Sequence, residues 1–151
     1  MSEQENIRVV KQAFENVNKH VLDDDDQLSS PNARIKTVDS PTELSRDQYR
    51  EYMRGILNAF PDIHFTIRDI IAQGDKLAVT WTAKGTNKGN YVSPDGKSMP
   101  ATNRLVQLPG CTIYEFRNNM VARQEVLWDQ VSFMAQLGLM TEQRATAGAR
   151  H

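Results

Sequence analysis

Residues 63–85 read IHFTIRDIIAQGDKLAVTWTAKG, a run that is typical of two β-strands joined by a tight turn. β-Branched and aromatic residues, which pack well on a pleated surface, occur in both halves of the run. Gly74 and Asp75 lie between the halves, and both residue types tolerate the left-handed backbone that a tight hairpin requires. The pattern therefore predicts a hairpin with strands at residues 63–73 and 77–85.

Two more runs of this kind follow at residues 103–116 and 120–128, and Asn118 and Asn119 supply the turn between them. Consecutive short strands with turn residues between them predict a curved antiparallel meander. Residues 94–97, PDGK, lie in a long polar connection between the second and third strands. This connection either folds over the mouth of a pocket or projects into water.

The last predicted strand has two different faces. Arg123, Glu125 and Asp129 share one parity, which makes one face charged. Ala122, Val126 and Trp128 share the other, which makes the opposite face mostly apolar. The charged face meets either solvent or a polar pocket, and the pattern does not choose between them.

Two helices are predicted before the strands. Ser2 with Glu5 and Ser45 with Gln48 have the spacing of capping boxes, which satisfy the free N–H groups of a first helical turn. Pro61 closes the second helix. The apolar residues that follow the two caps recur at helical spacing and predict one buried stripe for each helix: Ile7, Val10, Phe14, Val17 and Val21 in the first, and Tyr49, Tyr52, Met53, Ile56 and Phe60 in the second. The helices therefore come first in the chain and the strands follow.

The final segment of this pattern, residues 125–139, reads EVLWDQVSFMAQLGL and predicts a strand that gives way to a short amphipathic helix at Asp129. Asp is a preferred N-cap residue, because its carboxylate accepts hydrogen bonds from unpaired N–H groups of the first turn. A carboxylate held at such a junction can also face a pocket and act as a general base. Both roles for Asp129 are open at this point.

Composition narrows the function classes. The chain has 151 residues and a net charge of -1, which fits one globular domain and gives no electrostatic reason to expect nucleic acid as a partner. We expect a single domain at residues 1–140 with a polar tail at 141–151. Neither a leader nor a membrane span is predicted, so the expected compartment is the cytoplasm. Cys111 is the only cysteine and is expected to be an inert core residue.

Three segments resemble the SnoaL-like polyketide cyclase family, which belongs to the superfamily of cone-shaped folds related to nuclear transport factor 2. They are FPDIHFTIRDIIAQGDKLAVTWTAKGTNKG at residues 60–89, GCTIYEF at 110–116 and LWDQVSFMAQLGL at 127–139. The resemblance implies an α+β fold with the shape of a cone-shaped barrel, in which a strongly bent antiparallel sheet wraps the N-terminal helices. It also implies a short C-terminal helix and an open apolar cavity. It also implies a homodimer through the outer face of the sheet, where we expect apolar residues such as Val79 and Leu105.

The characterised cyclases of this family close a polyketide ring by an intramolecular aldol reaction, with an aspartate as general acid and base and with neither cofactor nor metal. The family's Trp-Asp motif falls on Trp128 and Asp129, so the resemblance implies Asp129 as the catalytic residue, with Glu125 as the nearest second carboxylate. A carboxylate whose pKa is raised by an apolar pocket could deprotonate a carbon flanked by carbonyl groups. The implied partner is a planar, largely apolar carbonyl compound.

The chain departs from the family pattern at Asn87, where family members commonly have a histidine that can titrate. His20, His64 and His151 have no partner in sequence that would form a catalytic pair. Three functions therefore stay open: a cofactor-independent cyclase or isomerase, a noncatalytic module that binds a small molecule or dimerises, and a hydrolase of the same superfamily. The expected pocket draws on the following residues, with Trp81 and Tyr114 on neighbouring strands: Met53, Phe60, Trp81, Asn87, Tyr114, Phe116, Glu125 and Trp128.

Overall fold

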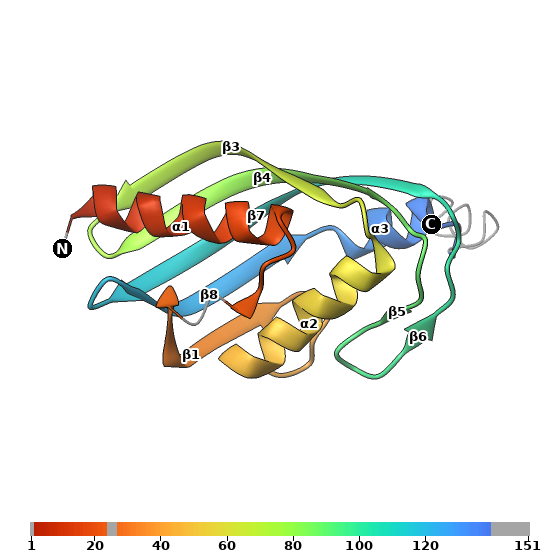
Figure 1. Ribbon diagram of the computed structural model, residues 1–151, viewed down its shortest axis with the longest axis horizontal. Coiled ribbons are helices and arrows are strands. Elements are labelled where there is room, and N and C mark those ends of the chain that lie inside the picture. The colour runs from red at the N-terminus through yellow and green to blue at the C-terminus, as the bar shows by residue number, and fades with distance from the viewer. Residues whose placement is uncertain (1, 24–26, 140–151) are drawn as a thin grey trace, which may run out of the picture.

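The computed structural model describes residues 2–23 and 27–139 of the chain (Figure 1). Its elements follow in the order α1 (Glu3–Asn18), β1 (Ser29–Thr37), β2 (Leu44–Ser45), α2 (Arg46–Ala59), β3 (His64–Gln73), β4 (Lys76–Thr86), β5 (Tyr91–Val92), β6 (Ser98–Met99), β7 (Leu105–Arg117), β8 (Met120–Trp128) and α3 (Gln130–Gln136). The tail expected at residues 141–151 lies outside the described residues.

Six strands form one sheet in the order β2-β1-β8-β7-β4-β3, while β5 and β6 form a separate hairpin. The four strands predicted from sequence, β3, β4, β7 and β8, pair as the expected antiparallel meander. However, β1 runs parallel to β8. The sheet is therefore mixed and not closed, which corrects the expectation of a purely antiparallel barrel. The expected α+β class is confirmed.

Strand β1 was missed because its sequence pattern is short. Its buried and exposed residues alternate only from Ala33 to Thr37, after a polar start that includes Pro31. The turns were recognised more easily. Gly74, Asn118 and Asn119 all have positive φ angles, of 62°, 55° and 65°, as tight hairpins require.

The two long helices begin at the predicted caps. The Ser2 hydroxyl accepts a hydrogen bond from the N–H of Glu5, and Ser45 and Gln48 form a complete reciprocal capping box. Both helices lie on the concave side of the bent sheet (Figure 1). Most residues of their apolar stripes join the inner residues of the strands in the main core, where Val10, Ile35 and Val79 are almost fully buried. Two predicted stripe residues do not: Val21 lies beyond the end of α1 and is 38% exposed, and Phe60 packs in a second apolar cluster.

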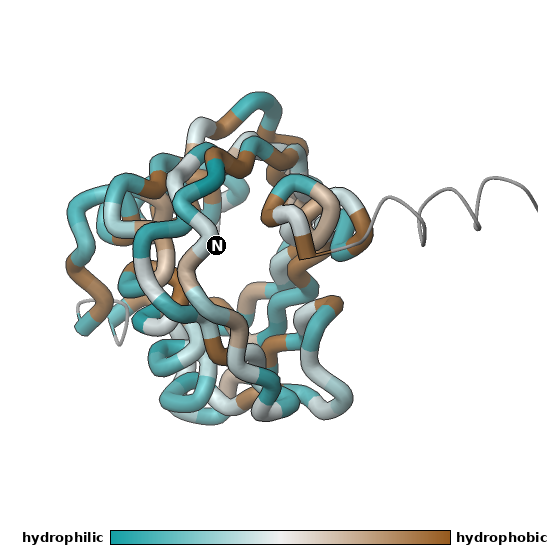
Figure 2. The backbone as a smooth tube through the Cα atoms, turned by 90° about the vertical axis from the view of Figure 1, so that its right-hand side faces the viewer, coloured by the Kyte–Doolittle hydropathy of each residue, from teal (hydrophilic) through white to brown (hydrophobic). Residues whose placement is uncertain are grey.

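Alternation along the strands separates this core from solvent. Figure 2 shows hydrophilic (teal) and hydrophobic (brown) residues interspersed along the backbone. On β4 the inward residues are Leu77, Val79 and Trp81. Val79 is fully buried, so it does not belong to the outer face on which we expected it. Its odd parity along β4 turns it inward with Trp81.

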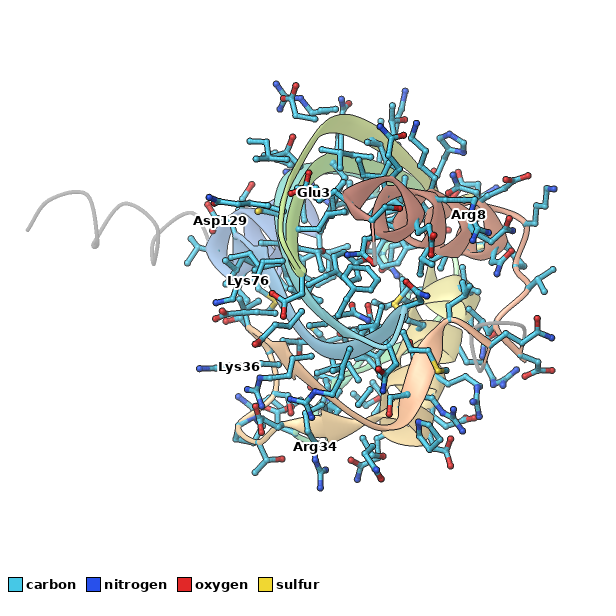
Figure 3. All side chains as sticks on the ribbon, turned by 90° about the vertical axis from the view of Figure 1, so that its left-hand side faces the viewer. Glu3, Arg8, Arg34, Lys36, Lys76 and Asp129 are labelled. Carbon is cyan, nitrogen blue, oxygen red and sulfur yellow. The ribbon has the colours of Figure 1, made fainter. Side chains whose placement is uncertain are left out.

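The outer face of the sheet does carry exposed apolar residues. Leu105, Ile113 and Leu127 are 54%, 41% and 39% exposed. Cys111 is half-buried and lies among residues of this face, not in the core as expected. Charged side chains surround the molecule, and Figure 3 shows Arg8, Arg34 and Lys36 pointing away from it. Among the helices that the structure describes, none is long and apolar enough to cross a membrane.

Candidate functional site: an apolar cavity with a tyrosine–aspartate pair

A cavity of about 160 Å³ lies between α1, α2 and the concave face of the sheet. Most of the residues around it are aliphatic or aromatic, and they come from both long helices and from strands β4, β7 and β8. Five of the residues predicted for the pocket line it: Met53, Phe60, Trp81, Tyr114 and Trp128. A cavity of about 150 Å³ can hold a benzene ring, so this one has room for roughly one aromatic ring with a small substituent.

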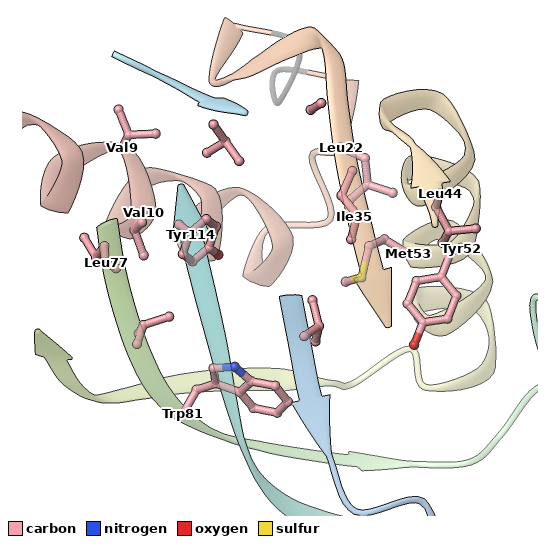
Figure 4. Close-up of a cluster of buried hydrophobic side chains, with 14 of the residues drawn as sticks. Val9, Val10, Leu22, Ile35, Leu44, Tyr52, Met53, Leu77, Trp81 and Tyr114 are labelled. Carbon is pink, nitrogen blue, oxygen red and sulfur yellow. The ribbon is translucent and has the colours of Figure 1, made fainter. Parts of the chain in front are cut away.

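Trp81 and Tyr114 lie on the paired strands β4 and β7, and Figure 4 shows both facing the interior together with Met53 of α2. The Trp81 indole is fixed by a buried hydrogen bond of 3.0 Å from its Nε1 to Oγ1 of Thr112. The indole lies across Gly110, where a β-carbon would overlap with the six-membered ring. The missing side chain at Gly110 therefore lets Trp81 form one wall of the cavity.

A second aromatic cluster closes the end of the cavity near α3. The Phe133 ring lies 5.2 Å from that of Trp128 and 5.9 Å from those of Phe60 and Tyr91, measured between ring centroids. The angles between the ring planes are 53° to 76°, which is the tilted or edge-on geometry that aromatic pairs favour. Short helix α3 thus contributes to the site through Phe133.

The polar groups near this end form a connected set. The Tyr91 hydroxyl donates a hydrogen bond of 2.6 Å to Oδ2 of Asp39, and Tyr91 and Tyr52 both line the cavity. Burial raises the pKa of Tyr91 well above its usual value, and the charge of Asp39 and the hydrogen bond to it raise it further. Burial also raises the pKa of Tyr52, with smaller contributions from neighbouring Tyr91 and Asp39. Both phenols therefore keep their protons at neutral pH.

The structure places Asp129 at the N-cap of α3. Its carboxylate accepts a hydrogen bond of 3.1 Å from the N–H of Ser132, and its side chain is exposed. Asp129 does not line the cavity. It borders a shallow depression on the outer face, and Figure 3 shows it at the edge of the molecule. Trp128, which precedes it, does reach the cavity.

Three other residues predicted for the pocket lie outside the set that lines it. Phe116 packs in the main core, and Glu125 has the opposite parity to the lining residues Gln124 and Val126. Asn87 is 1% exposed and holds the long connection before β7 in place. Its amide donates to the carbonyls of Ala59 and Gly89, and its Oδ1 accepts two hydrogen bonds from Thr102.

Tyr91 and Asp39 were not predicted as site residues from the sequence. Asp39 lies just beyond β1, the strand that was missed, and Tyr91 lies in the polar connection whose role stayed open. The two residues are 52 positions apart and no spacing rule links them. Among the described residues, no group of three or more His, Cys, Asp or Glu side chains is placed to hold a metal ion.

Together, a bent sheet wrapped around helices and an apolar cavity between them define a cone-shaped α+β protein with a small-molecule-sized interior. The family model for SnoaL-like polyketide cyclases matches residues 8–137, so this chain belongs to that family. A comparison with curated proteins found no match.

Solved structures with the same fold are distant in sequence. A candidate SnoaL-like polyketide cyclase from Jannaschia sp. CCS1 superposes with a TM-score of 0.80 at 15% identity, over 91% of this chain and 94% of that one. AclR, a candidate hydroxylase from Streptomyces galilaeus, gives 0.79 at 21% identity, over 93% and 100%. IdmH, a candidate polyketide cyclase from Streptomyces antibioticus, gives 0.75 at 22% identity, over 88% and 98%. At these identities the similarity establishes the fold.

Proposed function

We propose that this protein binds a small, flat, largely apolar carbonyl compound in its cavity and performs cofactor-independent acid–base chemistry on it, as a cyclase or isomerase. The observation that carries the proposal is an apolar, aromatic cavity with tyrosine hydroxyls at one end. Aromatic walls suit a flat ligand, and a few polar groups in an apolar site fix its orientation. Family membership supports the same class of reaction.

The cavity volume limits the ligand. At about 160 Å³ it is smaller than the ~300–1,000 Å³ typical of drug-sized ligands. A compound with one aromatic ring fits without rearrangement, whereas a compound with three or four fused rings requires α1 or α2 to move. Acetophenone, which has one ring and one ketone, is therefore a suitable probe.

Two carboxylates are candidates for the base. Asp129 is the one that the Trp-Asp motif indicates, and in this role it would have to leave its bond to the Ser132 N–H and turn toward the cavity. Asp39 is connected to the cavity by the hydrogen bond from Tyr91. Deuterium exchange on a bound ketone separates them, because the exchange should be lost in Asp39→Asn if Asp39 is the base and in Asp129→Asn if Asp129 is the base.

Acetophenone is expected to quench Trp81 fluorescence in a saturable way when Trp128 is replaced by phenylalanine. Trp81 lines the cavity, and with Trp128 replaced it is the only tryptophan left in the chain. In the same background, Ala83→Phe places a ring in the cavity and should abolish the saturable component. Quenching that rises linearly with acetophenone in both variants would indicate collisions in solution and would contradict the proposal.

A noncatalytic binding module is the second candidate function. Two observations favour it. Asp129 is exposed and caps α3, and Asn87, which stands where the family commonly has a histidine, uses its side chain to hydrogen-bond Ala59 and Thr102. This candidate predicts saturable binding without any proton exchange on the bound ligand.

We also propose a homodimer through the outer face of the sheet. Leu105, Ile113 and Leu127 are exposed on the adjacent strands β7 and β8, and a second copy would cover them. Sedimentation is expected to show a dimer at tens of micromolar, and Ile113→Lys to show a monomer. A wild-type protein that sediments as a monomer at that concentration would contradict this proposal.

A further inference from the structure

The residues that line the cavity do not include a carboxylate or a histidine within the described part of the chain. Their ionisable groups are two arginines and four tyrosines: Arg46, Arg50, Tyr49, Tyr52, Tyr91 and Tyr114. Arginine stays protonated and cannot accept a proton in this pH range. A base in the present geometry must therefore act through one of the tyrosines.

Tyr91 lines the cavity, and its hydroxyl is hydrogen-bonded to a carboxylate, at 2.6 Å from Oδ2 of Asp39. Tyr91 is 3% exposed, and its ring is held edge-on against Phe133. The other oxygen of Asp39, Oδ1, is buried and has no hydrogen-bond partner among the described residues. The carboxylate thus keeps unused capacity to take up a proton.

The electrostatics fix the direction of this hydrogen bond. An ionised carboxylate only accepts, so Tyr91 is the donor, and the raised pKa of Tyr91 keeps it protonated. Because its one proton points at Asp39, the Tyr91 oxygen can offer only lone pairs to a ligand. The side chains of Tyr52 and Tyr91 are also hydrogen-bonded to each other, so Tyr52 donates to one lone pair of the Tyr91 oxygen and the other lone pair is left for a ligand.

We propose that Tyr91 is the proton-accepting residue of the cavity and that Asp39 acts through it as the final proton acceptor. This inference rests on the proposed function. The C–H bond next to the ligand's carbonyl group breaks, its proton moves to Oη of Tyr91, and the Tyr91 proton moves to Oδ2 of Asp39. The electron pair of the broken bond stays on the ligand as an enolate. Reversal of both transfers returns a proton to carbon or to a new alkoxide.

Exchange of the methyl hydrogens of acetophenone for deuterium, followed by NMR in D2O, tests this assignment. The wild-type protein is expected to accelerate the exchange. Tyr91→Phe and Asp39→Asn should each slow the catalysed rate by about a hundredfold or more, which is the usual scale of a lost general base. Both variants should keep saturable binding of acetophenone, because the apolar walls are unchanged. Asp39→Glu should restore part of the rate constant at saturating ligand.

Asp75→Asn is the matched control, because it removes a carboxylate from an exposed turn that favours Asn equally well. A melting curve for each variant identifies loss of fold, and Asp39→Asn keeps an acceptor for Tyr91 if Tyr91→Phe fails to fold.

The outcomes are distinct. Wild-type protein that does not bind acetophenone contradicts the proposed function itself. Binding without catalysed exchange leaves the cavity's ligand class intact and overturns the role of Tyr91. Exchange that survives Tyr91→Phe and Asp39→Asn but is lost in Asp129→Asn overturns it as well, and assigns the base to Asp129.

Discussion

Replacing Gly110 with alanine is expected to lower the free energy of unfolding by about 3 kcal/mol, the upper end of the usual range for overpacking a core. A β-carbon at this position would overlap with the indole ring of Trp81, which lies across the glycine on the neighbouring strand. Trp81 cannot move easily, because its Nε1 is bonded to Thr112 and its ring packs edge-on against Phe65. Urea unfolding followed by circular dichroism measures the change.

The same substitution should also weaken acetophenone binding, since it displaces one wall of the cavity. Gly55→Ala is a matched control: Gly55 lies inside α2, and a β-carbon there meets nothing within 4 Å. That variant should gain roughly 0.5–1 kcal/mol from the better helix propensity of alanine. A Gly110→Ala protein as stable as wild type would show that Trp81 does not occupy the described position.

Asn87→Ala is expected to cost a similar amount, about 3 kcal/mol. The side chain is almost fully buried and uses both donors and its acceptor, on Ala59, Gly89 and Thr102. Leaving a buried polar group without its partner costs ~1–3 kcal/mol, and several groups lose one here. Urea unfolding again provides the measurement.

Asn90→Ala serves as the control from the same connection, because Asn90 is exposed and its side chain accepts a hydrogen bond from the N–H of Ala101. It should cost less than about 1 kcal/mol. Equal, small losses in the two variants would mean that Asn87 does not hold the connection and would reopen a role for it at the cavity.

Local signals in the sequence were sufficient to predict four of the six sheet strands. The hairpin turns carry residues that tolerate positive φ angles, and strands β3, β4, β7 and β8 have long apolar or alternating runs. Capping boxes likewise marked the starts of α1 and α2. These features depend on neighbours close in sequence, which is why they can be read without a structure.

The features that could not be predicted from the sequence depend on contacts between segments that lie far apart in the chain. The parallel pairing of β1 with β8 joins residues about ninety positions apart, and no local pattern specifies it. The same holds for Tyr91 and Asp39, which meet only after the β5–β6 hairpin packs beside the end of β1. Most apolar residues of the site were predictable, because residues that alternate on a strand or recur on a helix face inward together. Its polar pair was not.

The role of Asp129 could not be decided from the sequence for a different reason. The residue type, the Trp-Asp pair and the start of an amphipathic helix are compatible with a cap and with a catalytic base, so the sequence supports both. In the structure the cap is formed and the side chain is exposed. The motif position alone therefore does not place a carboxylate in the cavity.

A crystal structure of the protein grown with saturating acetophenone tests the central claim most directly, because it shows whether a flat carbonyl compound occupies the cavity. The account predicts the aromatic ring between Trp81, Tyr114 and Met53, with the methyl carbon nearest to Oη of Tyr91. An empty cavity, or acetophenone bound only at the outer face beside Cys111 and Asp129, would contradict it.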